Sequence, residues 1–328
     1  MKLSILDYGI VDKNLDYTST INHSYEYAKL AENLNYHSIW LTQHHSVLSL
    51  SISQPVIIAL HILAKTSKLK VGIAGFLLLH YPPLLIAETI STILHLYKNR
   101  SFFAFGANPG TPQLLNELNI KNISKSRFYA KSKTIVNYLN NNIYNNINLI
   151  PQNNNKVSLF ILVTSIKSAI WAAKHKFGII FGYFLNPDLE NCKKVFAAYR
   201  KHFYKYHKQE GKIIFAIFVV KINNQKKIKE FLDAATTYLL GRNNFNEFSY
   251  FPEYQDVKYL KYSDEEINLK KLSSKKFIIG NEKAISKQLD FFSEQLQLNH
   301  IMIVPFATSH QQRLQTIKTV AKIYKNKD

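Results

Sequence analysis

The sequence predicts an α/β fold, a (β/α)8 TIM barrel, because strand-like and helix-like segments alternate along all 328 residues. Eight short apolar runs have the continuous hydrophobicity of parallel strands that are covered on both faces. Segments with helical periodicity separate these runs, and eight such units fit a barrel of this length. A doubly wound open sheet is the competing fold, but it normally begins with a glycine-rich phosphate turn, and none follows the first strand at Leu6.

Each predicted element follows from its residues. Apolar and β-branched runs predict strands at Leu3–Leu6, Ser38–Leu41, Leu69–Gly72, Phe102–Phe105, Ser158–Leu162, Ile179–Phe181, Lys212–Lys221 and His300–Val304. Amphipathic or proline-led segments predict helices at Thr18–Asn33, Pro55–Lys65, Pro82–Tyr97, Lys167–Lys174, Leu189–Tyr206, Asn224–Gly241, Ala284–Leu296 and Gln311–Tyr324, with a mostly helical stretch over Gln113–Leu139. The asparagine-rich stretch Asn140–Asn155 predicts a loop, and Arg242–Lys276 predicts an insertion between strands seven and eight.

The composition restricts the class of protein. No apolar run reaches the eighteen residues of a membrane span, and Met1–Asp7 lacks the features of a signal peptide. The single cysteine, Cys192, excludes an internal disulfide framework and a cysteine-based metal cluster. We therefore expect a cytoplasmic protein that has no metal site and does not bind a membrane.

The formal net charge of +20 raises the question of nucleic-acid binding. The lysines are scattered over predicted helices and loops, and the chain is also rich in Asn, Ile and Tyr, as in Asn140–Asn148. Such a composition is typical of a genome-wide bias toward Lys and Asn. We therefore expect no specific nucleic-acid partner, although the charge would strengthen weak association with polyanions.

Polar and small residues follow the predicted strands. Taken singly, each has an ordinary structural explanation: a surface histidine pair, a tight turn at Ala-Gly, a helix N-cap at Thr-Ser, or a β-turn at Pro-Gly. In a barrel, however, these positions converge on the carboxyl-terminal mouth, where ligands bind. The groups concerned are His44 and His45 after strand two, Ala74-Gly75 after strand three, Asn108-Pro109-Gly110-Thr111 after strand four, Thr164-Ser165 after strand five and Gly182-Tyr183 after strand six.

Several of these motifs together resemble the bacterial-luciferase-like flavin monooxygenases, in the alkanal-monooxygenase-like branch. The matching segments, in chain order, are Trp40-Leu41-Thr42-Gln43-His44-His45, Val71-Gly72-Ile73-Ala74-Gly75, Pro82-Pro83 with Ala87-Glu88, Pro109-Gly110-Thr111, and Gly280-Asn281-Glu282-Lys283-Ala284-Ile285. The resemblance extends over essentially the whole chain and implies a single luciferase-like barrel domain over residues 1–328.

The resemblance implies that reduced FMN, supplied by a separate flavin reductase, reacts with dioxygen and that one oxygen atom passes to a small organic substrate. It implies His44 as the catalytic histidine, with His45 as its neighbour in an orienting or structural role. Ala74-Gly75 corresponds to a frequent non-proline cis peptide under the flavin ring, while Thr164, Ser165 and Asn108 correspond to further cofactor-binding positions. It also implies a homodimer. We expect the interface at the helices Pro55–Lys65 and Pro82–Tyr97, whose small and apolar residues suit close packing, although an ordinary core-facing stripe explains them equally well.

Three residues depart from the family pattern. Gln43 replaces a glutamate, Ala107 replaces an arginine that helps neutralise the flavin phosphate, and Val163 replaces a glycine. Loss of one charge-assisted contact lowers the binding free energy by about 1.5–3 kcal/mol. Lys167, in the next helix, is a candidate to replace the positive charge of that arginine. Two alternatives therefore stay open: a non-catalytic or decayed flavin-binding relative, and a deazaflavin-dependent reductase of related fold.

Overall fold

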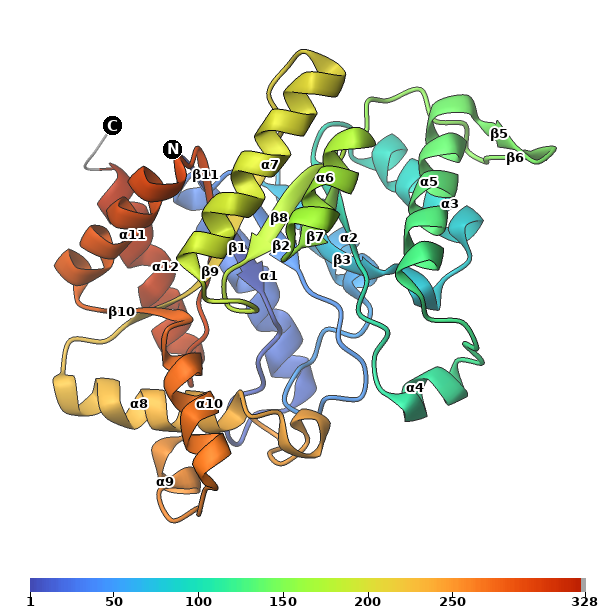
Figure 1. Ribbon diagram of the computed structural model, residues 1–328. Coiled ribbons are helices and arrows are strands. Elements are labelled where there is room, and N and C mark those ends of the chain that lie inside the picture. The colour runs from blue at the N-terminus through green and yellow to red at the C-terminus, as the bar shows by residue number, and fades with distance from the viewer. Residues whose placement is uncertain (326–328) are drawn as a thin grey trace.

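Eight parallel strands close into a barrel surrounded by helices in the computed structural model, which describes residues 1–325 (Figure 1). The hydrogen-bonded order is β1-β2-β3-β4-β7-β8-β9-β11, and β11 returns to β1. The barrel strands are β1 (Lys2–Asp7), β2 (Ser38–Leu41), β3 (Lys70–Leu77), β4 (Ser101–Gly106), β7 (Leu159–Val163), β8 (Gly178–Gly182), β9 (Ile213–Lys221) and β11 (His300–Val304). The (β/α)8 prediction is confirmed.

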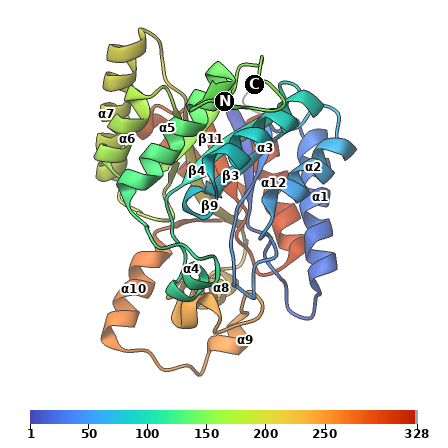
Figure 2. The ribbon, with the colours of Figure 1, turned by 90° about the vertical axis from the view of Figure 1, so that its right-hand side faces the viewer.

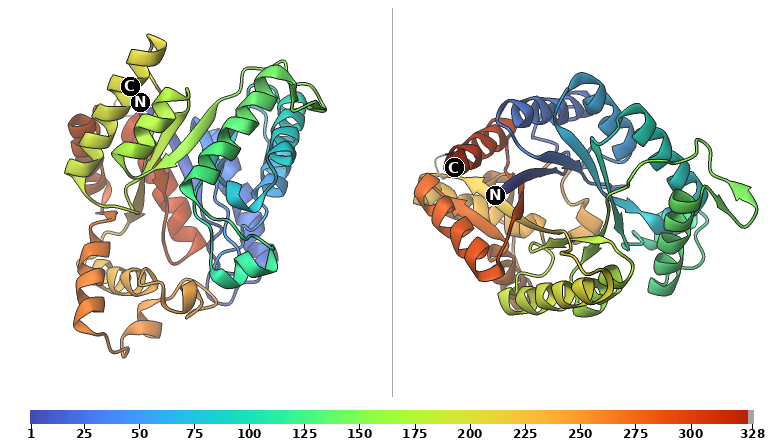
Figure 3. Two further views of the ribbon diagram at one scale, coloured as in Figure 1. Left: turned by 45° about the vertical axis from the view of Figure 1, so that its right-hand side comes forward. Right: turned by 90° about the horizontal axis from the view of Figure 1, so that it is seen from above.

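Helices follow the strands and form the outer layer, as the view along the barrel in Figure 3 shows. They are α1 (Tyr17–Asn33), α2 (Pro55–Lys65), α3 (Pro83–Leu96), α4 (Pro112–Glu117), α5 (Lys125–Asn141), α6 (Ile166–Lys174), α7 (Leu189–His207), α8 (Gln225–Tyr238), α9 (Tyr254–Val257), α10 (Asp264–Ser274), α11 (Glu282–Leu296) and α12 (His310–Lys325), with 3-10 turns η1 (Leu78–His80) and η2 (Arg242–Phe245). None of the helices described within residues 1–325 is long and apolar enough to cross a membrane.

The insertion between β9 and β11 is more structured than its sequence suggests. Within Arg242–Lys276 the chain forms η2, α9 and α10, and Figures 1 and 2 place α9 and α10 at the end of the barrel opposite the N-terminus. A further strand, β10 (Phe277–Gly280), pairs in parallel with the last four residues of β9. β10 was not predicted, because a run of four residues after a polar segment is too short to show a period.

Two other segments differ from the prediction. The stretch Gln113–Leu139 is two helices, α4 and α5, separated by a short unstructured connection. Within the predicted loop Asn140–Asn155, Ile143–Tyr144 and Ile147–Asn148 form a small antiparallel hairpin, β5-β6. The residues between these strands, Asn145 and Asn146, both have positive φ, a conformation that asparagine tolerates in tight turns.

The alternation of side chains along each strand produces two apolar cores. On β2, Ile39 and Leu41 point outward and pack with the helices, whereas Trp40 points into the barrel interior. The interior core also contains Phe160 from β7, Ile214 from β9 and Met302 from β11. Apolar residues on both faces explain why these strands have continuous hydrophobic sequences.

Trp40 fills the centre of the barrel because Gly72 on the neighbouring strand leaves space for its ring. The indole stacks on Phe102 at 5.5 Å between centroids and meets Phe160 edge-on. Its Nε1 donates to Ser38 Oγ at 2.8 Å. A Cβ atom at Gly72 would lie 2.2 Å from the indole, closer than any real contact.

We predict that Gly72→Ala lowers the free energy of unfolding by about 1–3 kcal/mol, because the new methyl group forces Trp40 out of place. Chemical denaturation followed by tryptophan fluorescence measures the change. Gly106→Ala is the matched control, since the nearest atom to its Cβ would lie at an ordinary 3.4 Å. Equal stability of the two variants would contradict the proposed role of Gly72.

Candidate active site

A cavity of about 260 Å³ lies at the carboxyl-terminal end of the barrel. We call it the mouth cavity. Its lining comes from seven of the barrel strands and the residues that follow them: Leu6, Tyr8, Thr42, Gln43, His44, Ala74, Gly75, Leu77, Gly106, Ala107, Asn108, Leu162, Val163, Thr164, Ile180, Gly182, Phe184, Leu185 and Ala216. These residues include no Lys, Arg, Asp or Glu, so the mouth cavity is electrically neutral apart from its histidine.

His44 is half-buried at the wall of this cavity, directly after β2. Its backbone N–H donates to the carbonyl of Ile52 at 2.9 Å, and its Nδ1 lies 3.1 Å from Thr42 Oγ1. The imidazole stacks along the ring of Tyr8 at 5.2 Å between centroids. Burial, with a smaller effect of the nearby His45, lowers the pKa of His44 to about 4. His44 is therefore a fixed, neutral base at neutral pH.

The buried side chain of Gln43 connects the ends of β2 and β3. Its Oε1 accepts a hydrogen bond from the backbone N–H of Leu77 at 3.1 Å. Its Nε2 donates to Tyr81 Oη and, at 2.8 Å, to His45 Nε2. Because an amide nitrogen only donates, these contacts hold the Nε2 of His45 unprotonated. Burial and the neighbouring His80 also lower the pKa of His45. Gln43 thus keeps this part of the site neutral.

The Ala74–Gly75 peptide bond is cis, as the resemblance implies, and both residues line the mouth cavity. The register between β3 and β4 shifts at this point. A Cβ atom at Gly75 would lie 2.6 Å from the carbonyl oxygen of Ala104. Glycine is therefore required here by the close approach of two strands.

The remaining predicted site residues divide into two groups. Asn108 and Thr164 line the mouth cavity and are exposed; Asn108 Oδ1 accepts a hydrogen bond from the N–H of Gly110 at 3.0 Å. His45 and Ser165 do not line it. Ser165 is the N-cap of α6, and its hydroxyl accepts a hydrogen bond from the N–H of Ser168 at 3.3 Å. The cofactor-binding roles of these four residues stay predictions.

The departures from the family pattern can also be located. Ala107 and Val163 line the mouth cavity, with Val163 buried and Ala107 exposed. Lys167 lies in the first turn of α6, where it is exposed and outside the cavity lining. Among the residues that line this cavity, none is a lysine or an arginine that could supply the positive charge expected from the resemblance.

Two aromatic residues that shape the site, Tyr8 and Tyr81, were not predicted from the sequence. Tyr8 follows β1 directly and covers His44, and its position at a strand end was an available signal. Tyr81 lies after η1, where only the folded chain brings its hydroxyl to Gln43. Among residues 1–325, no group of three or more His, Cys, Asp or Glu side chains is arranged to hold a metal ion.

The chain belongs to the family of luciferase-like monooxygenases, whose family model matches residues 1–268. A relative along the full length is the uncharacterized protein YceB of Bacillus subtilis, 27% identical over 98% of this chain and 99% of that protein. The N-acetyl-S-alkylcysteine monooxygenase of the same organism is 27% identical over 62% of this chain and 63% of that protein.

Solved structures share the fold. Apo-MsnO8 superposes with a TM-score of 0.87 at 20% identity, covering 99% of this chain and 98% of that chain. The oxygenating constituent of 3,6-diketocamphane monooxygenase from Pseudomonas putida, solved with FMN, gives a TM-score of 0.74 at 13% identity over 98% and 97% of the two chains. An F420-dependent secondary alcohol dehydrogenase gives 0.71 at 11% identity over 97% and 98%.

We predict that Gln43→Glu raises the pKa of His45 by about one unit or more, because a carboxylate beside the imidazole favours its protonated form. Proton NMR titration of the histidine rings measures this change. The matched control is Gln209→Glu, at an exposed position after α7, which leaves the titration of His45 as it is in the wild-type protein. A His45 titration that is identical in Gln43→Glu and in the wild-type protein would contradict the contact.

Proposed function

We propose that this chain is a flavin-dependent monooxygenase that receives reduced FMN from a separate reductase. One atom of O2 passes to a small organic substrate, and the other leaves as water with the two electrons and protons of the reduced flavin. The observation that carries this proposal is the neutral, largely apolar mouth cavity with the neutral imidazole of His44 at its wall. Membership of the luciferase-like monooxygenase family supports it.

The residues of the mouth cavity suit a flavin. Its volume of about 260 Å³ is just below the usual range of small-molecule sites, about 300–1,000 Å³, and matches one ring system better than a complete nucleotide. The apolar side chains Leu77, Leu162 and Phe184 would face the ring. Thr164 and the backbone N–H groups at the start of α6 are the groups that would hold the phosphate.

In this proposal the bound cofactor supplies the two-electron activation of dioxygen, and the protein controls water and protons. The apolar lining excludes water from the ring. Nδ1 of His44 lies against Thr42, so Nε2 is the nitrogen available to exchange a proton with the reacting groups. Because the pKa of His44 is lowered to about 4, the imidazole acts as a proton acceptor at neutral pH.

In this proposal the cofactor binds weakly, because Ala107 and Val163 stand at the phosphate site where the resemblance implies an arginine and a glycine. Without a cation in place of Ala107, the affinity for FMN falls by about tenfold or more relative to a site with an arginine. A deazaflavin-dependent reductase is the second candidate, and the fold shared with the F420-dependent alcohol dehydrogenase supports it. A flavin-binding protein without activity is the third.

We also propose a homodimer through α2 and α3. These helices carry large apolar side chains that are strongly exposed: Ile57 at 66%, Leu85 at 52% and Leu96 at 62%. Exposed apolar side chains on neighbouring helices are typical of a surface that is covered by a partner. A second copy of the chain is the partner that the family resemblance implies.

We predict that His44→Asn lowers the rate of oxygen transfer by about 10²–10⁴-fold, because the proton acceptor is lost, while binding of reduced FMN changes far less. The assay supplies photoreduced FMN and ¹⁸O2 to a panel of small thioethers, aldehydes and ketones, and mass spectrometry counts ¹⁸O in the products. The thioethers are included because a relative is an N-acetyl-S-alkylcysteine monooxygenase.

The matched control is His202→Asn on α7, a partly exposed histidine outside the lining of the mouth cavity, which leaves oxygen transfer unchanged. Reduced FMN that binds without ¹⁸O entering any product would favour the inactive flavin-binding protein. Tighter binding of the deazaflavin than of FMN would favour the reductase. Full activity of His44→Asn would remove this histidine from the mechanism.

We predict that Ile57→Glu combined with Leu85→Glu converts a dimer into monomers, because two carboxylates would be buried at the interface. Sedimentation velocity at micromolar concentration measures the change. Leu269→Glu, at a 45% exposed position on α10, is the control and leaves the dimer intact. A monomeric wild-type protein under these conditions would contradict the proposed dimer.

A further inference from the structure

A second cavity, of about 570 Å³, lies at the opposite end of the barrel. We call it the amino-terminal cavity. Four lysines line it, together with two histidines and one carboxylate: Lys2, Lys70, Lys156, Lys212, His37, His300 and Glu210. The mouth cavity, in contrast, has no lysine in its lining. The view from above in Figure 3 looks onto this end, where the N-terminus lies within the ring of strands.

The topology of the barrel explains why these residues meet. Lys2 is the first residue of β1 and Lys70 the first residue of β3, while Lys212 directly precedes β9. All the barrel strands are parallel, so their amino-terminal ends lie at one pole. In the sequence, these lysines are far apart and show no cluster.

The positive charges of this cavity outnumber the negative charges in its lining. Within residues 1–325, none of its four lysines forms an ion pair. Lys212 Nζ donates to Ser158 Oγ at 3.1 Å, and Lys70 Nζ lies 5.6 Å from the centre of the Phe102 ring. Glu210 is exposed and is the one carboxylate in the lining. Like charges held around one hollow repel each other unless an anion lies between them.

The charges of the lysines also affect the pKa values of the two histidines in this cavity. Burial, with smaller effects of the charges of Lys70 and Lys2, lowers the pKa of His37 to about 4. Burial, with smaller electrostatic effects of His37 and Lys2, lowers the pKa of His300 to about 3. Burial, with smaller effects of the charges of Lys2 and Lys70, also lowers the pKa of Lys212. These three lysines therefore lie close enough for their charges to repel one another.

The floor of the cavity is held in place before any ligand binds. His300 Nε2 lies 2.7 Å from Ser4 Oγ, which lies 2.6 Å from Ser38 Oγ, and Ser38 in turn accepts from the indole of Trp40. Phe102 stacks on that indole and completes an aromatic floor. A preformed hollow avoids much of the ordering cost of binding.

We propose that the amino-terminal cavity binds a small anion with two or more phosphate groups, which lie among Lys2, Lys70 and Lys212. The volume admits such a ligand, and several cations around one hollow suit a multiply charged group better than a single negative charge. The cations converge on a recess rather than along an open stripe, which favours a small anion over a nucleic acid. The proposal does not rest on the proposed oxygenase activity, because Trp40 and the barrel core separate the two cavities.

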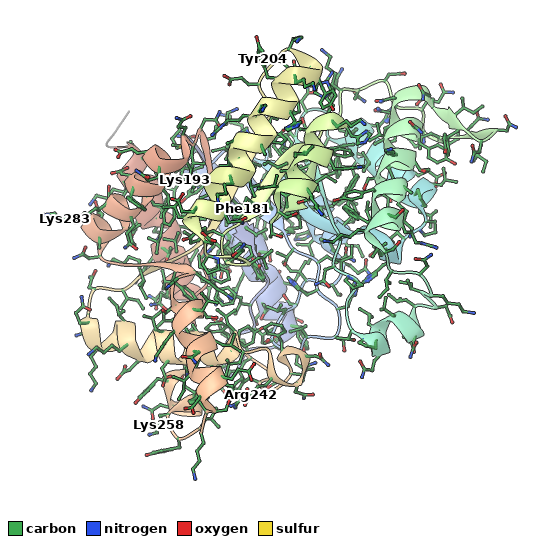
Figure 4. The ribbon with its side chains drawn as sticks, in the orientation of Figure 1. Phe181, Lys193, Tyr204, Arg242, Lys258 and Lys283 are labelled. Atoms are coloured by element: carbon green, nitrogen blue, oxygen red, sulfur yellow. The ribbon has the colours of Figure 1, made fainter. Side chains whose placement is uncertain are left out.

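The test is calorimetric titration of the full chain with inorganic pyrophosphate and with ADP, in a phosphate-free buffer at two salt concentrations. We expect saturable binding that weakens as salt rises, because phosphate contacts are electrostatic. Lys70→Gln combined with Lys212→Gln raises the Kd by about tenfold or more. The control is Lys258→Gln combined with Lys283→Gln, two exposed lysines outside the lining of this cavity, both labelled in Figure 4. This control removes the same net charge and changes the Kd by less than about twofold, because screened surface charges act only weakly on a ligand that they do not contact.

Proton NMR of the histidine rings locates the ligand independently of the variants. Pyrophosphate that shifts His37 and His300 but not His44 supports the proposal. Tighter binding of ADP than of pyrophosphate would show that the aromatic floor contributes to binding. Equal binding of the two ligands would show that the site recognises the phosphate groups alone. Either result supports the proposal. Absence of binding at millimolar pyrophosphate, equal losses in the two double variants, or shifts confined to His44 would overturn it.

Discussion

The parallel closure of the barrel is the constraint on which the rest of this structure depends. β1 pairs with β2 on one side and with β11 on the other, and β8 pairs with β9, so the ring has no gap. Closure in parallel sends every carboxyl-terminal strand end to one pole and every amino-terminal end to the other. Residues that are distant in sequence therefore meet twice: around His44 at the mouth, and around Lys2 at the opposite end.

Trp40 separates these two regions. Its ring occupies the barrel interior, with Phe102 and Phe160 against it, because Gly72 presents no side chain at that point. The same strand then continues into Thr42, Gln43 and His44, so one short segment supplies both the central core residue and the proposed base. This arrangement couples the stability of the barrel to the position of the imidazole.

The two ends of the barrel differ in electrostatics. At the mouth, the amide of Gln43 holds the Nε2 of His45 unprotonated, while burial keeps His44 neutral. A neutral, apolar pocket suits chemistry that water would disturb. At the other end, four lysines that form no ion pair within residues 1–325 surround a larger hollow. The high net charge of the chain is therefore not distributed evenly between the two cavities.

The sequence by itself determined the fold class, most strand positions and the residues at the mouth. Two strands have the predicted bounds, Ser38–Leu41 and His300–Val304. The mouth cavity is lined, as predicted, by Ala74, Gly75 and His44. These predictions succeeded because hydrophobic periodicity and polar residues at strand ends are local properties of the chain. Only the tertiary structure decided that Tyr81 reaches Gln43, that His45 and Ser165 lie outside the mouth cavity, and that scattered lysines gather at one pole. Those outcomes depend on strand register and barrel closure, which join distant residues and leave no periodic trace in the sequence.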